Sequence, residues 1–232
     1  MKKFLFAALC FCCISGFAQN AEKTDKKSSY KNEAADRIVM GFTFDNWLYD
    51  RNEIDSLSTK WNSWGFHAYY MYDIPLGKSK FSFAPGLGFS ASWVKNNSRL
   101  DESIDSAGTF FRPVGSDYKR NSLVTSYFDI PLELRYRGKP NAKNKNFKIA
   151  LGVIGGVQMA NHTKIKVEVG DEKKIYKQYR YGDLSKFRFG PTFRIGYGST
   201  NIFFYYSVLD FFKKDSGPDL HPFSVGFSIN GL

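Results

Sequence analysis

Acidic and arginine side chains recur on one face of several apolar segments, and they are the residues of this chain best placed to do chemistry. They comprise Asp73, Asp129, Glu133, Arg135, Arg188 and Arg194. A spacing of two keeps Asp129, Glu133 and Arg135 on the same side of a strand. Charges gathered on an enclosed face form either a path for protons or ions or a set of ion pairs. We expect an ion-pair network, because a narrow interior filled by side chains has no room for unpaired charges.

The three histidines, His67, His162 and His221, raise the alternative of catalysis. An enzyme that modifies lipids would need one of them beside a serine and an acid. His67 is expected on an inward face, His162 in a loop and His221 at the start of a strand, which groups none of them in that way. We therefore expect no enzyme, no catalytic residue and no cofactor. The His and carboxylate spacing also predicts no metal site.

The N-terminus has the features of an export signal. Lys2 and Lys3 precede an apolar run, and a small-x-small site ends at Ala18, so residues 1–18 are predicted to be a signal peptide. All three cysteines lie in that segment, which leaves no thiol in the mature chain. Residues 19–36 are polar and lack a period, and they are predicted to be a flexible periplasmic leader. Residues 37–232 are predicted to be the folded domain.

Composition narrows the class of that domain. The 232 residues are 18% aromatic, with 23 Phe, 14 Tyr and 20 Gly, which favours β-structure. The mean hydropathy is −0.37, and after the signal no apolar run has the length of a membrane helix. Without Lys2 and Lys3 the chain carries 31 basic and 22 acidic residues, a net charge of +9. For an exported protein this predicts contact with anionic lipid or saccharide phosphate, and no nucleic acid partner.

Eight segments alternate large apolar residues with small or polar ones, as strands do. They are 37–46, 64–75, 80–95, 123–137, 147–160, 186–198, 201–210 and 221–232. In 80–95, for example, Phe81, Phe83 and Phe89 alternate with Gly, Ser and Ala. Four prolines lie inside or at the edges of these segments, namely Pro75, Pro85, Pro131 and Pro191. Because proline has no N–H, we expect bulges or strand ends there.

The small side chains on the polar face of these segments decide between two kinds of barrel. A water-facing side would carry many long charged residues, whereas Gly, Ser and Ala leave room for a few bulky polar groups inside a closed barrel. The connections, of roughly 17, 4, 27, 9, 25, 2 and 10 residues, alternate long and short. We therefore predict an all-β fold, an eight-stranded antiparallel up-and-down transmembrane β-barrel filled by side chains. A soluble calycin-like barrel is the alternative, and membrane fractionation with a heat-modifiable gel shift separates the two.

Tryptophans near the long connections predict an aromatic girdle at the membrane interface. They are Trp47, Trp64 and Trp93, and aromatic rings are enriched at the headgroup level of outer-membrane barrels. The first expected partner is therefore the lipid of the outer membrane around the barrel. The location that follows is the outer membrane of a Gram-negative bacterium.

The segment Tyr127-Phe128-Asp129-Ile130-Pro131-Leu132-Glu133-Leu134-Arg135-Tyr136 resembles a strand of the PorT-like outer-membrane β-barrel proteins of Bacteroidetes-type bacteria. The Gly-rich strand 151–157 and Tyr205-Tyr206-Ser207 are similar to that family as well. The resemblance covers roughly residues 38–232 and implies an eight-stranded barrel in the outer membrane. Some relatives serve protein secretion and gliding, and no functional residues accompany the motif.

Three functions remain open from the sequence. The first is a small barrel with a structural or interaction role and no open pore, which presents loops 47–63, 96–122 and 161–185 outside the cell to an envelope protein or other partner. The second is an accessory of a secretion or envelope-assembly system, for which affinity capture from cross-linked membranes is the test. The third, lipid modification, predicts that His162→Ala or His221→Ala alters the lipid A mass spectrum. The charged stretch 164–180 is interpreted as a solvated loop or as a contact to lipopolysaccharide phosphates.

Overall fold

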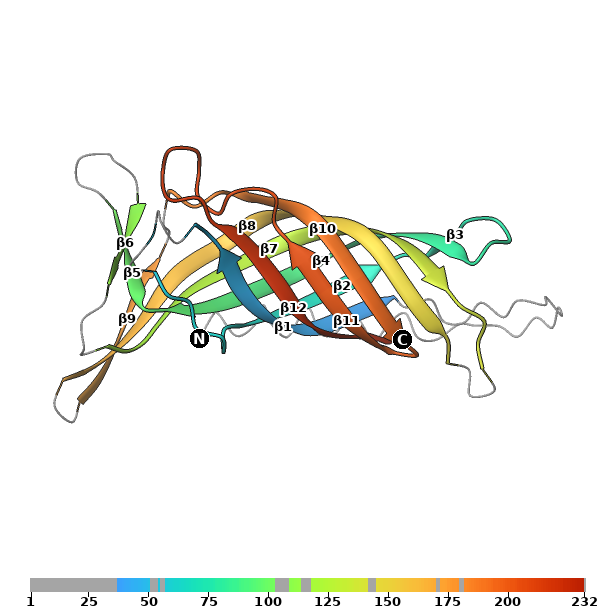
Figure 1. The fold of residues 1–232 in the computed structure, drawn as a ribbon, viewed down its shortest axis with the longest axis horizontal. Coiled ribbons are helices and arrows are strands. Elements are labelled where there is room, and N and C mark those ends of the chain that lie inside the picture. Colours follow the sequence, from blue (N-terminus) through green and yellow to red (C-terminus); the bar gives the residue numbers. More distant parts are fainter. Residues whose placement is uncertain are drawn as a thin grey trace, which may run out of the picture. The chain divides into compact units, whose positions relative to one another are not determined.

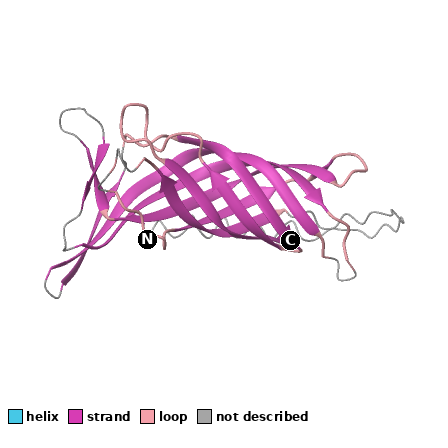
Figure 2. Ribbon diagram, viewed as in Figure 1, coloured by secondary structure: helices cyan, strands magenta, loops and turns pink. Residues whose placement is uncertain are grey.

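The computed structural model describes residues 37–50, 54, 57–102, 109–113, 118–141, 145–169, 172–179 and 182–231. Its regular elements are all strands (Figure 2). They are β1 (Ile38–Leu48), β2 (Trp64–Met71), β3 (Ile74–Pro75), β4 (Phe81–Asn96), β5 (Ser98–Glu102), β6 (Thr109–Pro113), β7 (Tyr118–Arg137), β8 (Phe147–Val169), β9 (Glu172–Tyr179), β10 (Phe187–Tyr197), β11 (Thr200–Tyr206) and β12 (His221–Gly231). No helix in the described residues is long and apolar enough to span a membrane. The predicted signal peptide and leader lie outside the described residues.

Eight of these strands close into one antiparallel barrel (Figure 1). The order around the barrel is β1, β2, β4, β7, β8, β10, β11 and β12, and β12 pairs with β1 from Ile38↔Gly231 to Leu48↔His221. The short β3 continues the course of β2 and pairs with β4. Neighbours around the barrel are also successive barrel strands along the chain. The predicted eight-stranded up-and-down barrel is therefore confirmed.

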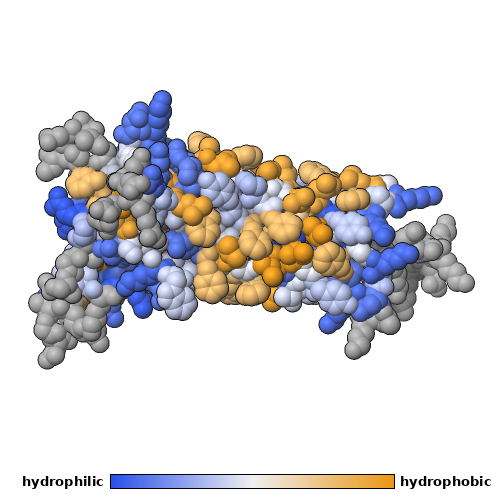
Figure 3. Space-filling model, in the orientation of Figure 1, coloured by the Kyte–Doolittle hydropathy of each residue, from blue (hydrophilic) through white to orange (hydrophobic). Residues whose placement is uncertain are grey.

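Large apolar side chains point away from the lumen. Phe42 on β1 is 66% exposed and Phe227 on β12 is 61% exposed, whereas the residues directly before and after each of them on its strand are buried. Figure 3 shows the result on one face of the molecule as a hydrophobic band across the middle of the barrel, with hydrophilic surface toward both ends. Exposed rings of this kind would be unfavourable in water and favourable in hydrocarbon.

The connections differ in length at the two ends of the barrel. Residues 76–80, 138–146 and 198–199 join strands at the end that also holds Ile38 and Gly231, which we call the turn end. Gly77 and Gly198 have φ of 64° and 63° there, a conformation that glycine adopts without steric cost. Residues 49–63, 97–117, 170–186 and 207–220 connect strands at the opposite end, the cap end.

Two of the predicted loops contain strands. Within 96–122, β5 pairs with β6 as a separate sheet, and within 161–185, β8 continues to Val169 and pairs with β9. The interpretation of 164–180 as a solvated loop was therefore wrong. Lys164, Ile165, Lys166 and Val167 alternate as a strand does, but their charges obscure the period.

The prolines inside strands cause none of the expected bulges. Pro85, Pro131 and Pro191 lie within β4, β7 and β10, and the register of their strands is unchanged across them. The pairing of β4 with β7 is nevertheless interrupted between Pro85↔Leu132 and Gly88↔Asp129, a gap that includes Pro131. Of the four prolines considered from the sequence, Pro75 lies at a strand end. The register shifts instead between β7 and β8. Ser126 pairs with Ala160 and Tyr127 pairs with Gln158, so β8 has one extra, unpaired residue at Met159. That bulge reverses which residues of β8 face outward beyond Met159.

Candidate functional site: the lumen and its cap

The inward residues of β7 and β10 build a buried ion-pair network near the turn end. Arg194 donates to Glu133 at 2.6 Å and 3.1 Å and to the side-chain oxygen of Asn230 at 2.6 Å. Arg135 donates to the same Glu133 carboxylate at 2.8 Å. The side chains of Arg194 and Glu133 are 3% and 6% exposed. Both guanidinium groups are thus paired with the nearly buried Glu133 carboxylate.

Asp73 extends this network toward the turn end. It follows β2, and its Oδ2 lies 3.8 Å from Nη1 of Arg135. Arg137 also donates to Asp73. The sequence did not identify Arg137 as a member, although it follows Arg135 at the inward spacing of two.

A second buried pair lies further along the lumen. Arg188 on β10 donates to both oxygens of Asp129 on β7, at 3.0 Å and 2.6 Å, and to the hydroxyl of Ser90 at 2.7 Å. Tyr69 donates its hydroxyl to Asp129 at 3.2 Å. The guanidinium carbon of Arg188 also lies 4.5 Å and 5.0 Å from the ring centroids of Tyr127 and Tyr205, and such cation–π contacts strengthen when desolvated. All six charged residues that the sequence assigned to the lumen thus lie there in ion pairs.

Glycine provides the space for these groups. A Cβ on Gly156 would fall on the Asp129 carboxylate and against Arg188, and one on Gly65 would fall on Asp45. The small residues that alternate with Phe and Leu in the sequence therefore leave volume that charged side chains of the neighbouring strands occupy.

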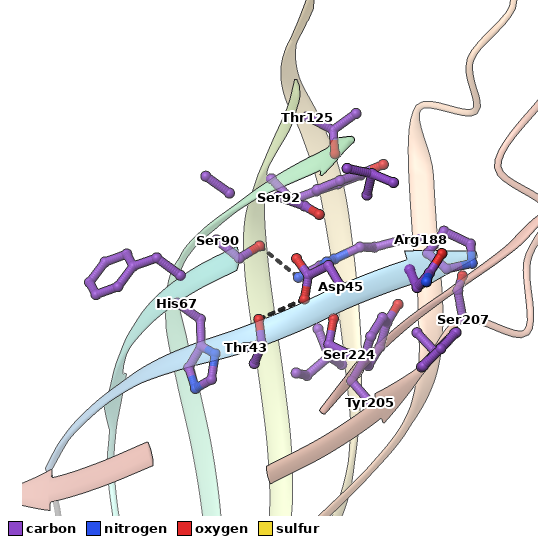
Figure 4. Close-up of a pocket in the computed structure, with 18 of the residues that line it drawn as sticks. Thr43, Asp45, His67, Ser90, Ser92, Thr125, Arg188, Tyr205, Ser207 and Ser224 are labelled. Atoms are coloured by element: carbon purple, nitrogen blue, oxygen red, sulfur yellow. Dashed lines mark hydrogen bonds between the residues drawn. The ribbon is translucent and has the colours of Figure 1, made fainter. Parts of the chain in front are cut away.

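A polar cavity adjoins the Arg188 pair (Figure 4). Its polar lining includes Thr43, Asp45, His67, Ser90, Ser92, Thr125, Arg188, Tyr205, Ser207 and Ser224. Asp45 accepts a hydrogen bond from the Thr43 hydroxyl at 2.6 Å. The centres of water molecules have about 50 Å³ available, which is room for a few waters.

Apolar side chains from the cap ends of β1 and β4 and from the 207–220 connection border this cavity. Trp47, Val94 and Phe211 line it and also belong to a buried cluster that we call the cap cluster. The cap cluster consists of Trp47, Ile54, Leu57, Val94, Leu100, Phe111, Leu123, Leu184, Phe211, Phe212 and Leu220. Sequence reasoning missed it, although Phe211-Phe212, Leu184 and Leu220 are apolar residues in segments assigned to loops.

The three tryptophans expected in a girdle have different positions. Trp64 and Trp93 stack on the outer face with ring centroids 4.1 Å apart, and Trp64 is 42% exposed. Trp47 is only 4% exposed and packs 5.5 Å from the ring of Phe211. The prediction for Trp47 was wrong because it shares the inward face of β1 with Thr43 and Asp45.

The three histidines lie on three different strands, β2, β8 and β12, and have different contacts. His67 is buried in the lumen between the rings of Tyr69 and Phe203, at centroid distances of 5.0 Å and 4.5 Å. His162 packs on Tyr179, and His221 lies 3.4 Å from Asp210. In the described part of the chain no hydrogen bond joins a serine hydroxyl to any of the three. Among those same residues, no group of three His, Cys, Asp or Glu side chains is placed to hold a metal ion.

The comparison with protein families agrees with this architecture. The sequence profile of the family described as outer membrane protein beta-barrel domain matches residues 17–213. The chain belongs to this family. Membership of the outer membrane protein beta-barrel domain family explains why rings face outward and charges inward, since the outer face meets lipid. The narrower PorT-like assignment stays a prediction. No curated protein matches the chain.

Proposed function

We propose that the protein is a closed, non-conducting barrel in the outer membrane of a Gram-negative bacterium, and that it acts through its folded cap. The observation that carries this proposal is the occupation of the lumen at successive levels. The Glu133 network, the Arg188–Asp129 pair and the cap cluster follow one another from the turn end to the cap end. Side chains thus occupy the path that a solute would need.

The cap is the part with the features of an interaction module. Four long connections contribute to a shared apolar cluster, which holds them in a fixed arrangement, and binding residues are often on connections that a rigid scaffold positions. Outer-membrane barrels place short turns in the periplasm and long connections outside the cell. The cap end would therefore face outward and present its surface to an envelope component or partner protein.

Conductance tests the closed lumen. The refolded protein, verified by a heat-modifiable gel shift, is expected to give no stepwise conductance in planar bilayers. Discrete openings of the wild-type protein would overturn the closed-barrel proposal.

Photo-crosslinking in cells tests the interaction role. Probes replacing Trp61, which is 82% exposed, and Leu209 at the cap end are expected to give discrete protein adducts. A probe replacing exposed Lys78 at the turn end is the control. Adducts absent from both cap positions, or the same adducts from Lys78, would contradict a role carried by the cap.

An accessory role in secretion or envelope assembly is the second proposal. It is supported by the resemblance of 127–136 to the PorT-like strand, which lies in β7 beside the lumen network. Capture from cross-linked membranes would then return a stoichiometric complex containing secretion components. Recovery of the barrel alone would argue against this role while leaving the cap proposal open to its own test.

A further inference from the structure

Basic side chains gather on the outer face of β4, β7, β8 and β9 at the cap end. They are Lys95, Arg120, Lys164, Lys166 and Lys177, which we call the basic wall. Lys95 pairs across β4 with Ser122, which pairs with Lys164, which pairs with Lys177. One step further out, Arg120 pairs with Lys166. Pairing across successive strands puts these residues on one continuous face.

The bulge in β8 creates this face. Before it, Leu151 and Val157 point outward, at 58% and 47% exposure. After it, Asn161 and Thr163 are buried, so Lys164 and Lys166 point outward. Without the extra residue, the lysines would point into the barrel and Ile165 would face out. The strand thus changes from lipid-facing apolar residues to outward charges at Met159.

The rows of paired residues below the basic wall fix its position relative to the membrane. Phe89, Phe128, Val157 and Phe187 pair in sequence across the outer face. Closer to the cap end, Trp64, Trp93, Val124, His162 and Tyr179 pair in the same way. From the middle of the barrel toward the cap end, the outer face therefore carries first apolar residues, then a row rich in Trp and Tyr, and then lysine and arginine. Trp and Tyr mark the headgroup level, so the basic wall begins where lipid phosphates lie.

The charges of the basic wall lack acidic partners within the described residues. Lys164 and Lys177 lie directly opposite each other, an arrangement that destabilises a strand pair. Burial together with Lys177 and Lys164 lowers the pKa of His162, and burial together with Arg120 and Lys60 lowers the pKa of Lys95. The lumen shows the opposite design, in which each guanidinium group meets a carboxylate. Unrelieved repulsion on an exposed face indicates an external anion.

We propose that the basic wall binds the phosphate groups of a membrane-anchored glycolipid of the lipid A type in the surrounding leaflet. Lysine serves as a mobile point charge for phosphate, and Ile175 and Tyr179 of β9, which share the face of Lys177, are exposed beside it to contact the lipid. Figure 1 shows β8 and β9 extending past the barrel at this end. The orientation of the cap end toward the outer leaflet is taken from the proposed function.

The test uses the mature protein refolded into nanodiscs of zwitterionic phospholipid, with bisphosphorylated lipid A or its dephosphorylated form added in small amounts. Native mass spectrometry counts bound lipid A, and titration gives the apparent affinity. The variant K164Q/K177Q removes two opposed charges of the wall. K213Q/K214Q is the matched control, because these two exposed lysines lie at the same end in the 207–220 connection. The gel shift verifies folding, which K164Q/K177Q is expected to retain since it relieves repulsion.

The wild type is expected to prefer the bisphosphorylated form, and K164Q/K177Q to bind it about thirtyfold more weakly at low salt, with the control unchanged. Raised salt is expected to reduce the difference. Equal binding by K164Q/K177Q and wild type, or equal binding of both lipid forms, would overturn the proposal. So would competition by a soluble acidic peptide with no lipid preference, since the wall would then be a protein site. Failure here would leave the conductance and crosslinking results intact, so the two proposals fail separately.

Discussion

The most informative single perturbation of this barrel is Glu133→Gln. The substitution keeps the shape of the side chain and removes the charge that Arg194 and Arg135 share. Glu133 is 5% exposed and Arg194 and Arg135 are each 3% exposed, so little water is available to replace the lost carboxylate. Leaving a buried charge without its partner costs about 3–5 kcal/mol. The equilibrium constant for unfolding should therefore rise by roughly two to three and a half orders of magnitude.

Reversible unfolding in urea from lipid vesicles, followed by tryptophan fluorescence and the gel shift, measures this change. Asp101→Asn is the control, because Asp101 pairs with Arg99 and Arg112, whose side chains are 41% and 58% exposed. Exposed pairs contribute about 0–1 kcal/mol. In a double-mutant cycle, Arg194→Gln is expected to recover part of the loss caused by Glu133→Gln. A loss for Glu133→Gln no larger than that of the control would refute the assignment of the network as a buried structural plug.

Three further perturbations test other levels of the structure. Gly156→Ala places a methyl group on the Arg188–Asp129 pair and is expected to cost about 1–3 kcal/mol of stability. The control is Gly155→Ala, whose Cβ would be 3.9 Å from its nearest neighbour, and this variant should unfold in urea like the wild type. Equal losses of stability for the two variants would count against the lumen packing. Trp47→Ala removes a cap-cluster ring and is expected to cost about 3–5 kcal/mol of stability and to make the cap sensitive to limited proteolysis. The control Trp61→Ala should leave the digestion pattern unchanged. An unaltered pattern for Trp47→Ala would mean that the cap does not depend on this cluster. His162 should titrate in NMR below the ordinary value of 6.5, because burial and the two neighbouring lysines lower its pKa. Since the folded state then binds fewer protons than the unfolded state, stability is expected to fall as pH drops through 6.5. Bound phosphate should raise the pKa of His162. A titration of His162 at or above 6.5 in the lipid-free protein would contradict the packing of the basic wall.

The lumen network shows how far the sequence alone leads toward a site. Asp129, Glu133 and Arg135 follow one another at even spacing, and Arg188 and Arg194 do so on another segment, so alternation alone places them on inward faces. Alternation does not identify the pairs. Arg194 meets Glu133 and Arg188 meets Asp129 because of the relative positions of β7 and β10, which lie on either side of β8.

The cap and the basic wall required the tertiary structure. Trp47 is on an inward-facing position of β1, but its burial depends on Phe111 and Phe211 from connections far along the chain. Lys164 and Lys166 face outward because of one extra residue at the bulge in β8, which shifts the parity of everything after it.

The sequence by itself determined the architecture: the number of barrel strands, the outward direction of the large rings, the inward direction of the charges and the alternation of long and short connections. These properties are local, because the direction of a side chain on a strand depends on the period of its own segment. The tertiary structure decided which charges pair, that the long connections pack on a shared apolar cluster, and where lysines of three strands meet. These properties depend on register between distant segments, and a shift of one residue changes the face on which a side chain lies.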